Sequence, residues 1–115
     1  MVLSKWQQRR WGEVEAELTR IVERLVSDGA ERVVLYGSYA RGDFHADSDV
    51  DLLIVKETDE RFIDRIASAL AITGAKIPVE PVVYTHAELD QMRARHSGLL
   101  SDVERDGKVL YERGV

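Results

Sequence analysis

VVLYGS at residues 33–38 and DVDLLIV at residues 49–55 are the two stretches that set the architecture of this chain. Each holds a short apolar run, rich in branched aliphatic residues, of the kind that forms a buried strand. Gly37-Ser38 interrupts the first run and favours a short helix from Ser38 to Arg41, and residues 41–48 are polar and typical of a loop. We therefore expect two buried strands joined by a turn, a short helix and a polar loop.

The flanking sequence predicts further helices and strands in alternation. Apolar residues recur at helical spacing over about residues 6–27 and again over residues 59–70. Residues 79–84 predict a third strand, and Thr85 with Glu88 three positions later predicts a capped helix from His86. That helix is expected to break near residues 97–98, resume to residue 106, and precede an edge strand at 109–111. The pattern favours an α/β (α+β) fold with helices layered on one sheet, and it leaves parallel and mixed strand pairing open.

Composition limits the classes of function. The chain has 115 residues, 44% hydrophobic and 32% charged, which fits one globular domain over residues 1–115. It has no cysteine, so disulfides and thiolate metal sites are excluded. A net charge of −5 argues against nucleic acid as a direct ligand. No apolar run approaches the ~20 residues of a membrane span, and the polar, basic start is unlike a signal peptide. We therefore expect a cytoplasmic protein with no membrane contact.

Asp49 and Asp51 are the first candidate site residues. Residues two apart in a strand point to the same face, so the two carboxylates would lie side by side. Such a pair is costly unless a positive group neutralises it, and hard divalent cations such as Mg²⁺ prefer oxygen ligands. The alternative interpretation is two solvated acids at the start of a strand.

Glu80 and Gly37-Ser38 strengthen the metal interpretation. Glu80 lies in an apolar strand, where an acid usually has a partner, and it joins the two aspartates if the strands are neighbours. Alternatively it is an edge-strand acid facing water, since Pro81 favours edges. Gly37-Ser38 allows close backbone approach and exposes amides that bind phosphate, although a plain turn with a serine cap fits as well. Together these groups predict a phosphoryl-transfer site with two metal ions.

These residues resemble the polymerase-beta-like nucleotidyltransferase superfamily, whose mark is Gly-Ser, ten residues, then Asp-x-Asp, with a third acid on a later strand. Here the pattern is Gly37-Ser38, then Asp49-Val50-Asp51, with Glu80 as the later acid. Arg41-Gly42, Ser48 and the closing stretch DGKVLYE at residues 106–112 resemble the minimal nucleotidyltransferase, or MNT, branch. The resemblance covers about residues 32–112 and implies a short, mostly mixed sheet flanked by helices.

The resemblance implies a Mg²⁺-dependent transfer of AMP from ATP, with release of pyrophosphate. It implies that Asp49 and Asp51 bind two Mg²⁺ ions and the triphosphate. Glu80 would bind the catalytic ion and help deprotonate the acceptor hydroxyl. Gly37 and Ser38 would hold the phosphates, and the nucleotide-binding set also includes Arg41 and Ser48. Glu80 departs from the superfamily, in which this acid is commonly the shorter aspartate.

The same resemblance implies a partner. Stand-alone MNT proteins of this size resemble antitoxins that pair with a HEPN-type ribonuclease toxin and add AMP to one of its tyrosines. We therefore expect an antitoxin that forms an oligomer with such a toxin. Two other functions stay open: stoichiometric binding of the toxin without catalysis, and nucleotide transfer to a small molecule or RNA. The retained acids favour the enzyme, because a protein that only binds would be free to lose them.

Overall fold

A mixed four-stranded sheet forms the centre of the protein. The computed structural model describes residues 2–114, so Met1 and Val115 of the predicted 1–115 domain lie outside the described part. The strands run in the order β3-β2-β1-β4. Their bounds are β1 Arg32–Tyr36, β2 Val50–Val55, β3 Val79–Tyr84 and β4 Lys108–Glu112. β1 pairs antiparallel with both β2 and β4, whereas β2 and β3 are parallel.

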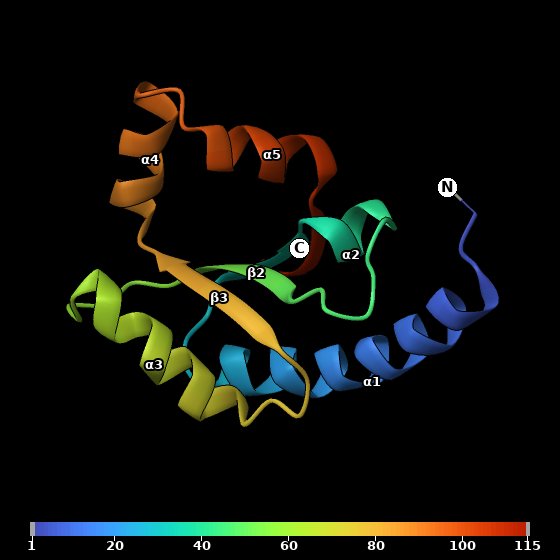
Figure 1. Ribbon diagram of the computed structural model, residues 1–115. Helices are drawn as coiled ribbons and strands as arrows, with labels where there is room; N and C mark the ends of the chain where they lie inside the picture. Colours follow the sequence, from blue (N-terminus) through green and yellow to red (C-terminus); the bar gives the residue numbers. More distant parts are fainter. Residues whose placement is uncertain (1, 115) are drawn as a thin grey trace.

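Helices cover both faces of this sheet (Figure 1). Their bounds are α1 Lys5–Ser27, α2 Ser38–Arg41, α3 Phe62–Thr73, α4 His86–Ala94 and α5 Gly98–Asp106. α1 and α3 lie on one face and α4 and α5 on the other, while the short α2 follows directly from β1. The predicted short mixed sheet flanked by helices is confirmed.

The alternation of side chains along the strands divides the core into two layers. Val33 and Leu35 of β1 pack on the α1 and α3 side, whereas Val34 packs with Leu89 of α4 and Val103 of α5 on the other side. Successive strand residues point to opposite faces, so runs such as Leu52–Val55 are buried throughout. This apolar packing fixes which side chains of β2 face α4 and α5.

Helix caps account for several of the element boundaries. Thr85 accepts a hydrogen bond from the backbone N–H of Glu88, and Glu88 accepts one from Thr85, which is the capping box predicted from the sequence. A second box, Ser4 with Gln7, begins α1. α3 begins later than expected, at Phe62, because residues 58–61 form a turn in which the Thr58 hydroxyl accepts from the Glu60 N–H. No helix within residues 2–114 is both long and apolar enough to cross a bilayer.

Candidate active site

Asp51 lies at the centre of the candidate site because of the strand register. It is paired with Glu80 on the parallel strand β3 and with Tyr36 on the antiparallel strand β1. Residues paired across neighbouring strands point to the same face. Asp51 shares its face with Leu53, which packs in the α4 and α5 layer. The register therefore brings the predicted second and third acids together on the α4 and α5 side of the sheet.

Asp49, the residue directly before β2, completes the group of acids. A hydrogen bond with Asp49 is the largest of the influences that raise the pKa of Glu80, followed by partial burial and by the charges of Asp49 and Asp51. Burial is the main cause that raises the pKa of Asp51, and the charge of Asp49 adds to it. Both shifts indicate negative charges that lack sufficient compensation within the chain. A hard divalent cation, whose preferred ligands are carboxylate oxygens, fits this donor set.

Tyr36 forms the third member of the row across the sheet, and sequence reasoning missed it. Burial, followed by the charge of Asp51, raises the pKa of the Tyr36 hydroxyl to about 12. The hydroxyl therefore stays protonated at physiological pH beside the acids. Its position directly before Gly37-Ser38 was the available sequence signal.

Gly37 explains how the predicted phosphate turn meets the acids. It directly precedes α2, and its backbone φ of 76° is one that residues other than glycine rarely adopt. A Cβ atom at this position would lie 2.1 Å from Oδ2 of Asp51. The turn and the carboxylate are therefore in direct contact, and only glycine leaves room for both. Ser38 begins α2 at this contact.

Arg41 is a positive group whose charge acts on Asp51. Its charge lowers the pKa of Asp51, although burial outweighs this influence. Its guanidinium is 3.1 Å from a carboxylate oxygen of Asp43 and 4.0 Å from one of Asp106, and it is 42% exposed. Arg41 is thus held beside the site and remains accessible to a ligand.

Ser48 lies on the same loop, but its hydroxyl is engaged in the loop itself. It accepts a hydrogen bond from the backbone N–H of His45 at 2.9 Å, and the His45 ring accepts one from the N–H of Asp47 at 3.3 Å. These bonds shape the turn that leads into Asp49. The structure therefore gives Ser48 a role in positioning the loop.

The first turns of α1 hold the opposite end of this loop, a feature that sequence reasoning missed. The Gln7 amide donates to the carbonyl oxygens of Gly42 and Phe44 at 3.3 and 3.0 Å. The Phe44 ring stacks on Tyr39 at 4.2 Å, and the Tyr39 hydroxyl accepts from Arg10 Nε at 3.2 Å. The Ser4-x-x-Gln7 capping pattern was readable in the sequence, but the partner loop was not. We call these contacts of Gln7 and Arg10 the α1 clamp.

Another group of possible metal ligands lies elsewhere. Glu31, Glu57 and His86 are the one set within residues 2–114 whose ligand atoms all lie within 4.8 Å of one another. Each member already has a partner: Glu31 accepts from His86 and Arg113, and Glu57 accepts from the His86 N–H.

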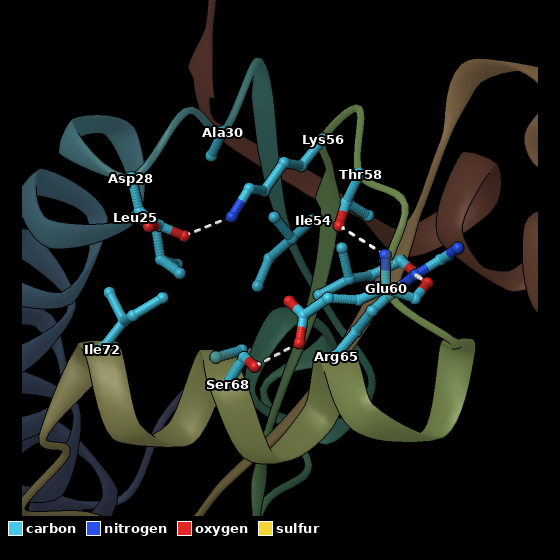
Figure 2. A pocket seen from close by; sticks show the side chains of 12 residues that line it. Leu25, Asp28, Ala30, Ile54, Lys56, Thr58, Glu60, Arg65, Ser68 and Ile72 are labelled. Carbon is cyan, nitrogen blue, oxygen red and sulfur yellow. Dashed lines mark hydrogen bonds and ion pairs between the residues drawn. The ribbon is translucent and has the colours of Figure 1, made fainter.

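A small cavity of about 20 Å³ lies between α1, α3 and β2, at the end of β2 remote from Asp51 (Figure 2). Lys56 pairs with Asp28 across it, and Ser68 donates to Glu60 at 2.7 Å. Its volume suits about one water molecule. Lys56, which follows the apolar end of β2, is thus used in an ion pair far from the candidate phosphate turn.

Comparison with known proteins agrees with this geometry. Residues 16–105 match the family described as the nucleotidyltransferase domain. Two candidate protein adenylyltransferases of Methanocaldococcus jannaschii are each 38% identical to this chain. One match covers 63% of this chain and 77% of the relative, and the other covers 70% and 78%.

Solved structures share the fold. A candidate nucleotidyltransferase from Sulfolobus solfataricus superposes with a TM-score of 0.72 at 23% identity, covering 98% of this chain and 93% of the other. A structure of the toxin–antitoxin pair MntA-HpeT gives a TM-score of 0.57 at 20% identity, covering 84% and 72%. The family match, the two relatives and the shared fold together assign this chain to the nucleotidyltransferase domain family, as a nucleotidyltransferase of the polymerase-beta-like fold.

Proposed function

We propose that this chain, as one nucleotidyltransferase domain, transfers AMP from ATP to a hydroxyl group of a protein partner. The observation that carries the proposal is the register that places Asp51 beside Glu80, with Asp49 close enough to raise the pKa of the same glutamate. Protein as the acceptor is supported by the two relatives named as candidate protein adenylyltransferases. AMP as the transferred group follows from the same names.

In this proposal Asp49, Asp51 and Glu80 hold two Mg²⁺ ions. When bound, such ions would stabilise the negative charge that develops during the transfer. Gly37 and Ser38 hold the triphosphate against Asp51, which the close contact of Gly37 with that carboxylate supports. Arg41, which is exposed and next to Asp51, binds phosphate oxygens, and Ser48 holds the loop that carries Asp49.

The reaction forms a bond between the acceptor oxygen and the α-phosphorus and breaks the bond from that phosphorus to the pyrophosphate oxygen. The acceptor proton passes to Glu80, the acid paired with Asp51 across β2 and β3. Pyrophosphate leaves with the electron pair of the broken bond. AMP stays on the partner as a phosphodiester.

The partner in this proposal is a toxin, specifically a HEPN-type ribonuclease modified on a tyrosine, and the chain acts in the cytoplasm as its antitoxin. The MNT-like closing stretch at residues 106–112 supports this choice, and the MntA-HpeT pair provides a precedent on the same fold. The toxin and the chain would form a hetero-oligomer.

The test uses ATP labelled at the α-phosphate, ATP labelled at the γ-phosphate, Mg²⁺ and the product of the adjacent gene. We expect only the α label on the partner, because a kinase would transfer the γ label instead. Asp51→Asn should lower the rate of transfer by more than about 100-fold, since even groups that merely support metal ligands contribute 10–100-fold. Asp47→Asn, an exposed acid of the same loop, is the matched control and should keep the rate.

Two outcomes would contradict the proposal. Unchanged labelling by Asp51→Asn would place the chemistry elsewhere. A tight complex that suppresses toxin activity without any label would identify a binding antitoxin instead.

A further inference from the structure

The end of α5 lies beside α2, although the two helices are far apart in the sequence (Figure 1). Asp106 is the last residue of α5 and the first of the closing stretch DGKVLYE. One of its carboxylate oxygens is 4.0 Å from Nη1 of Arg41, the last residue of α2. The closing stretch therefore contacts the arginine that stands next to the candidate active site.

Gly107 explains how the end of α5 comes so close to this arginine. A Cβ atom at this position would lie 2.3 Å from the backbone oxygen of Val103 and 2.9 Å from Cγ1 of Val34. Val34 belongs to β1, the strand that leads into Gly37. Only glycine thus allows the end of α5 to lie directly on β1, and this seat leaves the preceding Asp106 beside α2.

The guanidinium of Arg41 has an acid on two of its nitrogens. Its Nε is 3.1 Å from a carboxylate oxygen of Asp43, and its Nη1 faces Asp106. Within residues 2–114 its Nη2 makes no hydrogen bond or ion pair. A guanidinium is planar and holds its donors in a fixed fork, so two fixed nitrogens determine where the third one lies. The arrangement therefore leaves Nη2 as the donor for a phosphate oxygen.

Asp106 differs from an ordinary surface acid. Its side chain is 18% exposed, whereas that of Asp43 is 47% exposed. Arg105 donates to the same oxygen of Asp106 at 3.0 Å. This bond is the main cause that lowers the pKa of Asp106, and the charge of Arg41 adds to it. A carboxylate that a second arginine holds in place is a fixed point, whereas two freely exposed partners contribute little.

We propose that Asp106 is a positioning residue that orients Arg41 toward the triphosphate of ATP. The inference rests on the proposed function, since it requires Arg41 to bind phosphate. Asp106 acts through Arg41 and does not itself contact the substrate. Gly107 keeps the end of α5 where the carboxylate reaches the guanidinium. The Asp-Gly pair of the closing stretch thus supports the nucleotide site from the far end of the chain.

The test measures the Kd of α,β-methylene-ATP, which cannot release pyrophosphate, for the full chain in the presence of Mg²⁺. Asp106→Asn should raise this Kd by about fivefold or more, in the range of measured couplings between contacting residues. Asp106→Glu keeps the charge and should restore part of the affinity. Asp102→Asn is the matched control, because Asp102 is the other carboxylate of α5 that pairs with Arg105, and it should keep the Kd. In AMP transfer, Asp106→Asn should raise KM for ATP more than it lowers kcat.

A double variant shows whether Asp106 acts through Arg41. Arg41→Met should weaken binding of the analogue by itself, and Asp106→Asn should then raise the Kd no further. Melting curves without ligand verify that each variant is folded, and Asp106→Ala is a second variant with the same expected loss.

The inference is overturned if folded Asp106→Asn or Asp106→Ala binds the analogue as the unmodified chain does. It is also overturned if the loss persists in full in the Arg41→Met background, or if Asp102→Asn shows an equal loss. An unmodified chain that binds the analogue but transfers no AMP would contradict the proposed function alone. An unmodified chain that does not bind the analogue would contradict both.

Discussion

Gly37 is the residue on which the geometry of the candidate active site depends most directly. Its missing side chain allows the phosphate turn to touch Asp51, since a Cβ would lie 2.1 Å from the carboxylate oxygen. The positive φ adds a second reason for glycine. Sequence reasoning identified this glycine as a point of close backbone approach, but the group that it approaches became evident only from the fold.

Gly37→Ala is therefore expected to lower AMP transfer by about 100-fold or more, because a displacement of about 1 Å at a reacting centre has that effect. The control is Gly12→Ala in the exposed interior of α1, where an added Cβ meets nothing within 4 Å. It should keep full activity and stabilise the chain by roughly 0.5–1 kcal/mol. Rates and denaturation curves of both variants test this, and an active Gly37→Ala would contradict the proposed contact.

Arg65 is a residue whose role no sequence pattern revealed. It is only 7% exposed and joins three elements, with bonds to Val83 of β3 and to Glu88 of the α4 cap. In the sequence alone, a charged residue within a helix is expected to face solvent. The partners of Arg65 are determined by tertiary packing, which the sequence pattern does not show. The pKa of Glu88 is lowered chiefly by this arginine, as expected of a close ion pair.

Arg65→Met should destabilise the chain by about 2–3 kcal/mol, because it leaves two backbone carbonyls and Glu88 without their charged donor. The matched control is Arg61→Met, which removes an arginine that is 81% exposed and paired only with Asp64. It should change stability by less than about 0.5 kcal/mol. Chemical denaturation measures both, and equal effects would show that the buried position of Arg65 is unimportant.

The α1 clamp links one helix to the loop that leads into Asp49, one of the proposed catalytic acids. Gln7 bonds to two loop carbonyls and also closes the capping box of α1, so a single amide fixes both ends of the contact. We expect Gln7→Ala to reduce AMP transfer by about tenfold under conditions in which the chain stays folded, because the loop then positions Asp49 less well.

Gln8→Ala is the control for this variant, since Gln8 bonds only to Leu3 within the exposed start of the same helix. The loss of AMP transfer in Gln7→Ala should exceed the loss in Gln8→Ala, even where the two variants have the same melting temperature. If both variants lose activity equally, the effect belongs to the helix start in general and not to the clamp.

Among the elements, the strands, the short α2 and the Thr85 cap were predictable because their signals are local. Apolar runs and the Thr85–Glu88 pattern need no knowledge of distant residues. The pairing of Asp51 with Glu80 was not predictable, because the register of parallel strands depends on how the whole sheet assembles. The side chains of the α1 clamp were missed for the same reason, since its two halves are far apart in the chain.

At the scale of the whole molecule, we expect the stability of the folded chain to respond to pH in opposite ways with and without metal. The pKa values of Asp51 and Glu80 are raised in the folded state, so the folded chain binds these protons more tightly than the unfolded chain. Their contribution to stability is therefore fully present below the ordinary carboxylate pKa and is lost as pH rises through the raised values. Mg²⁺ competes with the protons, so it should stabilise the chain only where the acids are ionised.

We expect Mg²⁺ to raise the melting temperature at pH 7.5 relative to EDTA and to have no effect near pH 4. A concentration of about 100 times Kd corresponds to ~2.7 kcal/mol of stabilisation. Asp51→Asn should raise the melting temperature of the metal-free chain at neutral pH, because it removes a charge from the group, and it should abolish the Mg²⁺ effect. A Mg²⁺ effect that persists in Asp51→Asn would place the ions at other ligands.

Glu80 reaches the two aspartates through a neighbouring strand that follows a helical crossover, and not through a fixed distance along the chain. Lengthening a surface connection costs little, about 0.6 kcal/mol for each doubling of its length. Insertions and deletions in the crossover should therefore leave catalysis intact. Searches of genomes with rigid spacing patterns will recover the glycine–serine and paired-aspartate half of such enzymes and overlook their third carboxylate, so that active proteins are misjudged as degenerate ones.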